Sequence, residues 1–334
     1  MATVRYGDHR VPLAPGETVL DGLLRAGADV AHACRSGACK ACALQAAPGS
    51  VPEAAQQGLR ASERRRGVFL ACQCRPQADL EVHAADHADE VGAEVIEVAP
   101  LSATVTRLRL RPDSPLSHRA GQYVAMRRAD GLTRSYSIAS LPQEPWVELH
   151  VGLVPGGQMS RWVVQQARPG DRVSLRGPYG DCVYVPEEPQ APLLLVGVGT
   201  GVAPLWGVAR EAVAAEHRGP IVVIEAAATP AGLYLHEPWR ALARAHERVE
   251  LLSCVLAGGD RGELREAPVD AVAGERFREL GAPKDAFALL CGDPPIVHRL
   301  RRGLFLAGLS SRRIFADAFV MGPPPASREA SMAV

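Results

Sequence analysis

The chain has 334 residues, of which 47% are apolar and 22% charged, and its 37 basic and 37 acidic side chains leave no net charge. This length predicts two or three domains, with three as our working number, and the balanced charge argues against a nucleic-acid partner. No basic stretch followed by an apolar run opens the chain, and eight cysteines are too few for a disulfide scaffold, so we expect a cytoplasmic protein.

Residues 1–88 are expected to form a small mixed unit of short strands around a helix that begins near Glu17. This unit holds four cysteines with the spacing C-x4-C-x2-C-x29-C, which are Cys34, Cys39, Cys42 and Cys72. The spacing is that of plant-type 2Fe–2S sites, in which four thiolates hold two irons. Gly37 can adopt backbone angles closed to other residues, which lets N–H groups of the loop turn toward the sulfurs.

A structural zinc site is the alternative, because the pair Cys39 and Cys42 also has zinc-ribbon spacing. Its four ligands would be Cys39, Cys42, Cys72 and Cys74. That site leaves Cys34 unused, so the spacing favours the iron–sulfur cluster. Cys182 and Cys254 have no partner at ligand spacing and are expected to pack in hydrophobic cores.

Residues 1–88 therefore resemble a plant-type ferredoxin domain, which implies a β-grasp-like fold. The segment GLRASERRRGVFLACQCRPQADLEV resembles the closing part of the ferredoxin domains of oxygenase reductases. One departure is Lys40, where this family commonly has Gly, and a cation there is expected to alter the cluster's potential or its docking face. The basic run at residues 60–66 is expected to be a solvated helix face, with docking of an acidic electron acceptor as the alternative.

Residues 91–189 show strands of alternating polarity separated by Gly and Pro, which predict an antiparallel β-barrel. The stretch RSYSIAS resembles the R-x-Y-S motif of the ferredoxin–NADP reductase superfamily, which binds FAD. The resemblance implies that Arg134 pairs with the FAD pyrophosphate and that Tyr136 lies against the isoalloxazine or ribityl. It also implies that Ser137 acts catalytically, with its hydroxyl near flavin N5.

A second segment, VPGGQMSRWV, follows about twenty residues later at a predicted helix start. It resembles the family's second phosphate-binding segment, which implies FAD contacts from Gly156, Gly157 and Ser160. The GPYG sequence at residues 177–180 completes the family's order of motifs. Gly152 departs from the basic residue often found in the strand before this loop.

Residues 190–322 alternate between strands and helices, which predicts a Rossmann-like parallel sheet with crossover helices. Between the first strand and helix lies a Gly-rich turn that contains Gly197, Gly199, Thr200, Gly201 and Pro204. Glycines there let a pyrophosphate approach the backbone, and the form G-x-G-T-G-x-A-P resembles the superfamily's nicotinamide-binding loop. The same glycines argue against a membrane span over the nearly uncharged residues 191–209.

The stretch LLCGDPP resembles the superfamily's C-G-x-P motif, which implies that Cys291 is catalytic and that Gly292 lies beside the hydride path. An inert buried thiol at Cys291 is the alternative. Phe319 corresponds to the terminal aromatic segment that covers the flavin in this superfamily. The Pro-rich residues 323–334 are expected to be a disordered tail.

The coenzyme preference is expected from the residues after the second strand of this domain. No cation occurs from Ile221 to Leu235, although an NADP enzyme requires one for the 2′-phosphate. Ala228 stands at the position where the family often has Arg, and Glu225 is expected either to repel a phosphate or to accept from a ribose hydroxyl. NADH is therefore the expected coenzyme.

Nearly the whole chain resembles the reductase components of bacterial multicomponent oxygenases, including those of toluene, phenol and methane monooxygenases and of ring dioxygenases. The resemblance implies electron transfer from NADH to FAD, then to the 2Fe–2S cluster and finally to a separate oxygenase or hydroxylase protein, with no membrane partner. Two alternatives are a reductase that serves a deoxysugar-biosynthesis dehydratase and a redox-sensing module. Cofactors would perform the chemistry, so His150, His236 and His298 are expected to be structural or surface residues.

Overall fold

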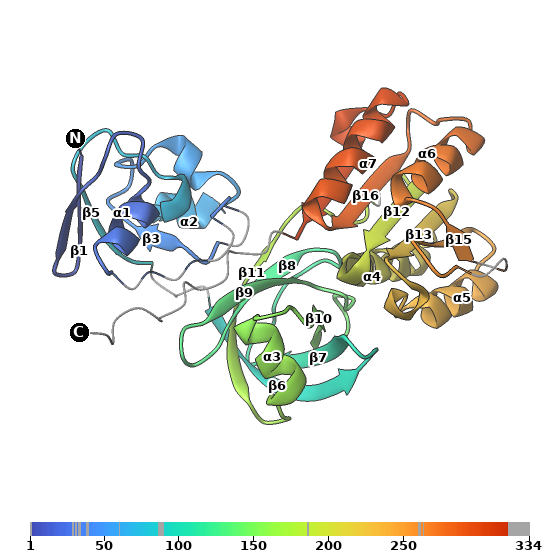
Figure 1. Ribbon diagram of the computed structural model, residues 1–334, viewed down its shortest axis with the longest axis horizontal. Helices are drawn as coiled ribbons and strands as arrows, with labels where there is room; N and C mark the ends of the chain where they lie inside the picture. Colours follow the sequence, from blue (N-terminus) through green and yellow to red (C-terminus); the bar gives the residue numbers. More distant parts are fainter. Residues whose placement is uncertain are drawn as a thin grey trace.

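The computed structural model describes residues 2–28, 30, 32, 35–37, 40–59, 61–85, 90–185, 187–259, 262 and 264–319. Three sheets follow one another along the chain and form an N-terminal, a barrel and a C-terminal domain (Figure 1). The predicted tail at 323–334 and two of the predicted cluster ligands, Cys34 and Cys39, lie outside the described residues.

The N-terminal domain is a five-stranded mixed sheet in the order β2-β1-β5-β3-β4. β1 and β5 run parallel, with Val4 opposite Leu80, and the remaining pairs run antiparallel. Helix α1 begins after Thr18, whose side chain accepts a hydrogen bond from Asp21 N and so caps the helix. The elements are β1 (Thr3–Tyr6), β2 (His9–Pro12), α1 (Val19–Arg25), β3 (Ala43–Gln45), the 3-10 helix η1 (Glu53–Gln56), α2 (Ala61–Arg65), β4 (Val68–Leu70), the 3-10 helix η2 (Ala71–Gln73) and β5 (Leu80–Ala84).

The barrel domain is a six-stranded antiparallel sheet in the order β10-β7-β6-β11-β8-β9. The sheet curls until its two edges meet at a single bridge between Ile138 and Leu149. Met159 and Val163 of α3 pack into the core that the strands enclose. The elements are β6 (Glu90–Pro100), β7 (Val105–Pro112), β8 (Tyr123–Arg127), β9 (Thr133–Ser137), β10 (Val147–Gly152), α3 (Gln158–Gln165) and β11 (Arg172–Tyr179).

The C-terminal domain is a six-stranded parallel sheet in the order β15-β14-β13-β12-β16-β17. One core packs Leu205 of α4 and Trp239 of α5 on one face of the sheet, and a second core packs Phe277 of α6 and Leu300 of α7 on the other. The elements are β12 (Leu193–Val198), η3 (Gly199–Gly201), α4 (Val202–Ala214), β13 (Ile221–Ala227), η4 (Pro230–Gly232), α5 (His236–Ala245), β14 (Val249–Val255), β15 (Leu264–Glu266), α6 (Val269–Glu279), β16 (Phe287–Gly292), α7 (Pro294–Leu306), η5 (Ser311–Arg313) and β17 (Ile314–Ala318).

Strand β12 lies between β13 and β16, so the order of the sheet reverses beside it. In open α/β sheets, ligands bind at such a switch point, outside the carboxyl ends of the strands. The Gly-rich turn after β12 and the Cys291–Gly292 pair at the end of β16 both lie there. This topology therefore gathers the motifs that the sequence separates by about ninety residues.

The nearly uncharged residues 191–209 form β12, η3 and the first turns of α4 rather than one continuous helix. In the part of the chain that the structure describes, we find no helix with the length and apolar character that crossing a membrane requires.

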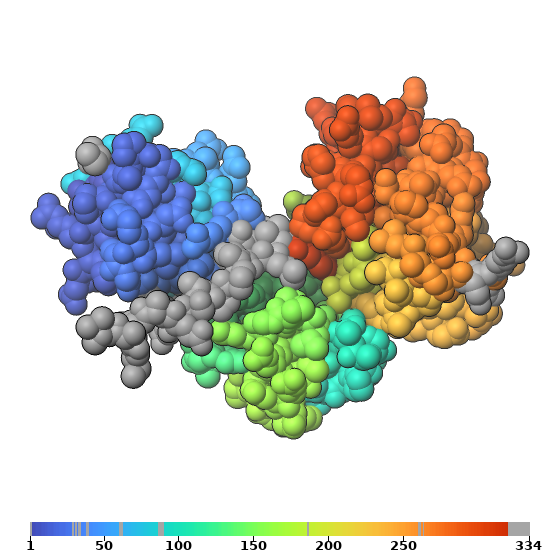
Figure 2. Space-filling view, viewed as in Figure 1, coloured from blue at the N-terminus to red at the C-terminus, as the bar shows by residue number. Residues whose placement is uncertain are grey.

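The barrel domain lies between the other two domains, with β11 and β9 toward the N-terminal domain and α4 toward the barrel (Figure 1; Figure 2). The approach of α4 is close, because a Cβ atom placed on Gly207 would lie 2.8 Å from Ala139 O of the barrel. The predicted fold class of mixed ferredoxin-like sheet, antiparallel barrel and Rossmann-like sheet is confirmed.

Candidate functional site

Cys42 and Cys72 come together through the pairing of β3 with β4. Ala43 lies opposite Leu70, and Ala71 N donates to Cys42 O at 3.0 Å, so each cysteine sits at the same end of the two-stranded ladder. Both residues are buried, and Gln73 Nε2 donates to Cys72 Sγ at 3.4 Å. N–H donors to sulfur are typical of iron–sulfur sites, so this pair fits its predicted role. The convergence of Cys34 and Cys39 on it stays a prediction.

Cys74 is buried in the same core of the N-terminal domain as Cys42 and Cys72. Burial raises the pKa of its thiol to about 12. Among the described residues, no three His, Cys, Asp or Glu side chains gather in a way that could hold a metal ion. The zinc alternative therefore gains no support from Cys42, Cys72 and Cys74.

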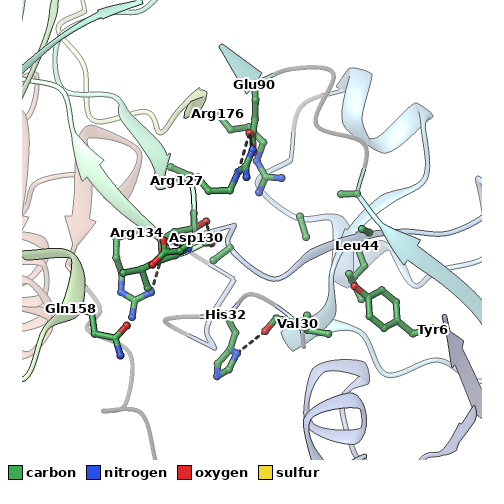
Figure 3. A pocket seen from close by; sticks show the side chains of 18 residues that line it. Tyr6, Val30, His32, Leu44, Glu90, Arg127, Asp130, Arg134, Gln158 and Arg176 are labelled. Atoms are coloured by element: carbon green, nitrogen blue, oxygen red, sulfur yellow. Dashed lines mark hydrogen bonds and ion pairs between the residues drawn. The ribbon is translucent and has the colours of Figure 1, made fainter. Parts of the chain in front are cut away.

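A cavity of about 650 Å³ lies between the N-terminal domain and the barrel (Figure 3). Arg134 of β9 and Gln158 of α3 line its barrel side, and Val30 and His32, from the segment that carries the predicted ligands, line the other. A cation beside a helix N-terminus suits a diphosphate. Gln158 is a candidate FAD-binding residue that the motifs did not identify. Its position as the first residue of α3 is the feature that could have indicated it.

The turn before α3 contains two glycines and leads directly into the helix N-terminus. Gly156 has φ +72°, and Gly157 is the N-cap residue of α3. The hydroxyl of Ser160 is buried, accepts from Val154 N at 3.1 Å and lies 3.4 Å from Gly157 O. Ser160 thus holds the loop in shape, and a direct contact of its hydroxyl with FAD stays a prediction.

Ser137 meets an acidic residue of the C-terminal domain that the sequence comparison did not identify. Its Oγ donates to Asp317 Oδ2 of β17 at 2.9 Å, across 180 positions of the chain. Burial raises the pKa of Asp317, although the Ser137 hydroxyl opposes this effect. Tyr136, the neighbour of Ser137 on β9, packs against the barrel core, and burial raises the pKa of its hydroxyl.

The Gly-rich turn owes its glycines to close packing. A Cβ atom on Gly201 would lie 2.2 Å from Cys291 O, and one on Gly197 would lie 2.7 Å from Val202 Cγ1. Gly199 has φ +56°, the left-handed region that favours glycine. Pro204 is buried in the first turn of α4, where its fixed φ suits a helix start, and its contact with the nucleotide stays a prediction.

The turn also touches the barrel through Thr200. A Cβ atom on Gly152 would lie 3.0 Å from Thr200 Cγ2, so the missing side chain at this barrel position makes room for the nucleotide loop.

Cys291 is fully buried at the end of β16, with its Sγ 3.5 Å from Cys182 Sγ. Burial, and then the neighbouring Cys182, raise the pKa of Cys291 well above that of a free thiol, so the group is neutral. Sequence spacing gave no sign of this cysteine pair. Phe319 N donates to Gly292 O at 2.8 Å. The terminal aromatic residue therefore lies at the same end of the sheet as Gly292, which was predicted to lie beside the hydride path.

A buried polar chain joins the barrel to the C-terminal domain. His150 Nδ1 lies 3.1 Å from the Tyr234 hydroxyl, and His150 Nε2 lies 3.0 Å from Glu148 Oε1. Burial acts to raise the pKa of Glu148, but its contacts with His150 and Arg109 outweigh it and lower the pKa to about 2. His150 is therefore structural, as expected from the sequence, and it acts at a domain boundary.

Glu225 does not face a ribose, contrary to the expectation from the sequence. It is 1% exposed, and its Oε1 accepts a hydrogen bond from Leu235 N at 3.0 Å. Burial raises the pKa of this carboxyl to about 7. The argument for NADH therefore depends on the absence of cations from Ile221 to Leu235 alone.

Three family models match successive parts of the chain: a 2Fe-2S iron-sulfur cluster binding domain over residues 3–77, an oxidoreductase FAD-binding domain over 93–184 and an oxidoreductase NAD-binding domain over 195–302. The reductase subunit of the aromatic O-demethylase of Amycolatopsis sp. is 33% identical over 330 residues, which are 95% of this chain and 98% of that protein. The chain belongs to the oxygenase reductases. Its N-terminal domain is thus a 2Fe–2S ferredoxin domain, its barrel the FAD-binding domain and its parallel sheet the NAD-binding domain.

Two further comparisons match this oxygenase reductase over nearly its full length. Terephthalate 1,2-dioxygenase reductase component 2 of Comamonas sp. is 31% identical over 341 residues, which are 96% of this chain and 97% of that protein. The crystal structure of the Amycolatopsis cytochrome P450 reductase GcoB superposes with a TM-score of 0.66 at 31% identity, covering 96% of this chain and 99% of that one. The predicted enzyme class, an electron-transfer oxidoreductase with 2Fe–2S, FAD and NAD domains, is confirmed.

Proposed function

We propose that this oxygenase reductase takes hydride from NADH and delivers electrons singly to a separate oxygenase that acts on an aromatic compound. One observation carries the proposal: the FAD-binding domain contacts the NAD-binding domain through Ser137 and Asp317 and the ferredoxin domain through β11. Such a central position suits a flavin, which accepts two electrons together and releases them one at a time. The names of the Amycolatopsis and Comamonas relatives support an aromatic substrate for the partner.

The residues of this chain divide the work of holding the cofactors. Arg134 and Gln158 would bind the FAD pyrophosphate in the cavity, and Gly156 and Gly157 would let it approach the start of α3. Cys42 and Cys72 would hold the cluster together with Cys34 and Cys39, the ligands of the C-x4-C-x2-C-x29-C spacing.

At the hydride site, the Ser137 hydroxyl and the Asp317 carboxyl would orient the reacting groups and hold a proton beside them. The raised pKa of Asp317 makes its carboxyl easier to protonate than that of a free aspartate. Cys291 O and the backbone of Gly201 pack so closely that the nicotinamide loop has one fixed position relative to β16. Cys291 contributes a neutral side chain that excludes water.

The coenzyme preference follows from charge. The end of β13 and the loop after it contain three consecutive alanines, Ala226 to Ala228, and no cation occurs before Leu235. A 2′-phosphate carries about two negative charges at neutral pH, so it would lack a partner there. The loop therefore favours NADH over NADPH.

The test is a spectrum and turnover assay on the purified protein. We expect iron–sulfur and flavin absorbance, release of FAD on denaturation, and reduction of cytochrome c with a kcat/KM for NADH well above that for NADPH. Purified oxygenase components encoded beside this reductase would then be tested as acceptors under single turnover. A protein without flavin or NADH turnover would contradict the proposal, as would exclusive transfer to a sugar dehydratase.

A further inference from the structure

Lys40 has a backbone conformation that its side chain makes unfavourable. Its φ is +58°, in the left-handed region where glycine is the residue without steric penalty. It is also 5% exposed, although lysine is among the residues that are least often buried. A glycine at this position would avoid both penalties, so the retained lysine must make compensating contacts.

The Lys40 ammonium connects the described part of the cluster-ligand loop, residues 35–37 and 40–42, to a second segment of the ferredoxin domain. Its Nζ donates to Gly37 O at 2.9 Å and lies 3.5 Å from Gln57 O. Gly58 leaves the space that the ammonium occupies, because a Cβ atom there would lie 2.6 Å from Lys40 Nζ. The ammonium thus connects the loop to the residues that follow η1, and both segments provide space or acceptors for it.

The backbone of Lys40 connects the same loop to the FAD-binding domain. Arg176 Nη2 of β11 donates to Lys40 O at 2.5 Å, and Arg176 is 7% exposed. Three positions further along β11, the Tyr179 hydroxyl donates to Glu63 Oε1 of α2 at 2.9 Å, and Glu63 is 2% exposed. Hydrogen bonds from charged groups in buried surroundings are among the stronger polar contacts in proteins.

We propose that Lys40 and Arg176 are a positioning pair that fixes the cluster-ligand loop on the FAD-binding domain and thereby sets the rate of electron transfer from flavin to cluster. Lys40 directly follows the predicted ligand Cys39 and precedes Cys42 by two positions. The inference rests on the proposed function. Each hydride brings two electrons and one proton to the flavin. The electrons pass one at a time to the cluster, which hands the first to the oxygenase before it accepts the second, and the proton passes to solvent. Because electron tunnelling slows steeply with distance, a small displacement of the loop slows this transfer and leaves the hydride step unchanged.

The experiment compares the cluster-loaded, FAD-loaded full chain with three variants. Lys40→Gly keeps a residue suited to the left-handed backbone and removes the ammonium. Arg176→Gln removes the Arg176 guanidinium and leaves Lys40 in place. The FAD content of this variant is checked first. Arg172→Gln is the matched control, because Arg172 lies on the same strand but pairs with Asp113 at the exposed side of the barrel.

Anaerobic mixing with NADH separates the two steps by their absorbance. We expect Lys40→Gly and the control to reduce flavin at the wild-type rate. We expect cluster reduction to slow about tenfold in both Lys40→Gly and Arg176→Gln, the change that loss of one charge-assisted hydrogen bond produces. The double variant should slow little further than either single variant, because members of a pair that acts as a unit are not additive.

The cluster midpoint potential distinguishes positioning from electrostatics. Lys40→Gly removes a positive charge near the cluster and should lower this potential, whereas Arg176→Gln should slow transfer without an equal shift. Slow transfer in Lys40→Gly alone, accompanied by a lower potential, would overturn the positioning role, as would equal slowing in the Arg172 control.

Hydrogen exchange tests the pair independently of turnover. Amides of residues 40–45 and 57–59 should exchange faster in Lys40→Gly and Arg176→Gln than in wild type, and unchanged exchange in both would overturn the proposal. Wild-type protein that fails to reduce its own flavin with NADH would instead contradict the proposed function, and the exchange result would still decide whether the pair fixes the loop.

Discussion

The FAD-binding domain meets its two neighbours in different ways. Toward the NAD-binding domain it uses residues of recognisable motifs, with Ser137 bonded to Asp317 and Gly152 packed against Thr200. Toward the ferredoxin domain it uses Arg176 and a tyrosine of β11, which approach a backbone carbonyl and a carboxylate. The side toward the NAD-binding domain, where hydride enters (the entry side), therefore combines close packing of small residues with a side-chain hydrogen bond. The side toward the ferredoxin domain, where electrons leave (the exit side), depends on side-chain hydrogen bonds that different residues could supply.

Gly201→Ala should have the largest effect, because it breaks the backbone packing of the entry side. The added Cβ would lie 2.2 Å from Cys291 O, a contact that only a backbone shift can relieve. We expect the kcat/KM for NADH-dependent ferricyanide reduction to fall about 100-fold. Gly303→Ala in α7 is the control, since open space surrounds that position and activity should remain at the wild-type level.

Ser137→Ala breaks the side-chain contact of the same interface. It removes the hydroxyl that bonds to the half-buried Asp317, and we expect NADH-driven flavin reduction to slow about tenfold. Stopped-flow absorbance at the flavin band is the measurement. Ser174→Ala on β11 serves as the matched serine variant, and equal slowing there would remove the specific role of Ser137.

Glu225→Gln should change how the stability of the NAD-binding domain depends on pH. The folded-state pKa of Glu225, about 7, lies above the value of 4.5 for a free glutamate, so its proton stabilises the native state below pH 4.5 and this stabilisation is lost as the pH rises toward 7. The total amounts to roughly 3 kcal/mol. Thermal unfolding should show that wild type loses more stability than Glu225→Gln between pH 5 and pH 8. If the stability of the two proteins changed with pH in parallel, the raised pKa of Glu225 would be contradicted.

Charge reversal at Arg64 and Arg65 tests the exit side and should have the smallest effect. Both residues are exposed on α2, next to Glu63, which bonds to the FAD-binding domain. If they steer an acidic oxygenase, reversal should slow partner reduction a few-fold at low salt and flatten its salt dependence, while NADH-to-ferricyanide turnover stays constant. Unchanged kinetics with the partner would leave α2 as a solvated face.

The glycine motifs and the cysteine spacing were predictable because each reflects a local requirement. Gly199 needs a positive φ, and Gly201 has no room for a side chain, so the sequence pattern carries the geometry. Cys42 and Cys72 could be paired from spacing because few cofactors fit it. These signals need no knowledge of how the domains pack.

Contacts between domains left no comparable signal. Asp317 is 180 positions from Ser137, and an acidic residue in a strand has many possible roles. Glu225 was misassigned because helices cover both faces of β13 and bury all of its side chains, so alternation did not distinguish inside from outside. Lys40 was visible as a departure from the family, but its positive φ and its carbonyl contact with Arg176 required the fold.

The ladder between β3 and β4 has a consequence for how the protein acquires its iron. Backbone hydrogen bonds between the two strands place Cys42 and Cys72 at one end of the ladder, so the sheet itself arranges half of the predicted ligand set. A scaffold protein that donates a preassembled cluster could transfer it first onto this pair, and maturation would then finish when Cys34 and Cys39 replace the donor's own ligands.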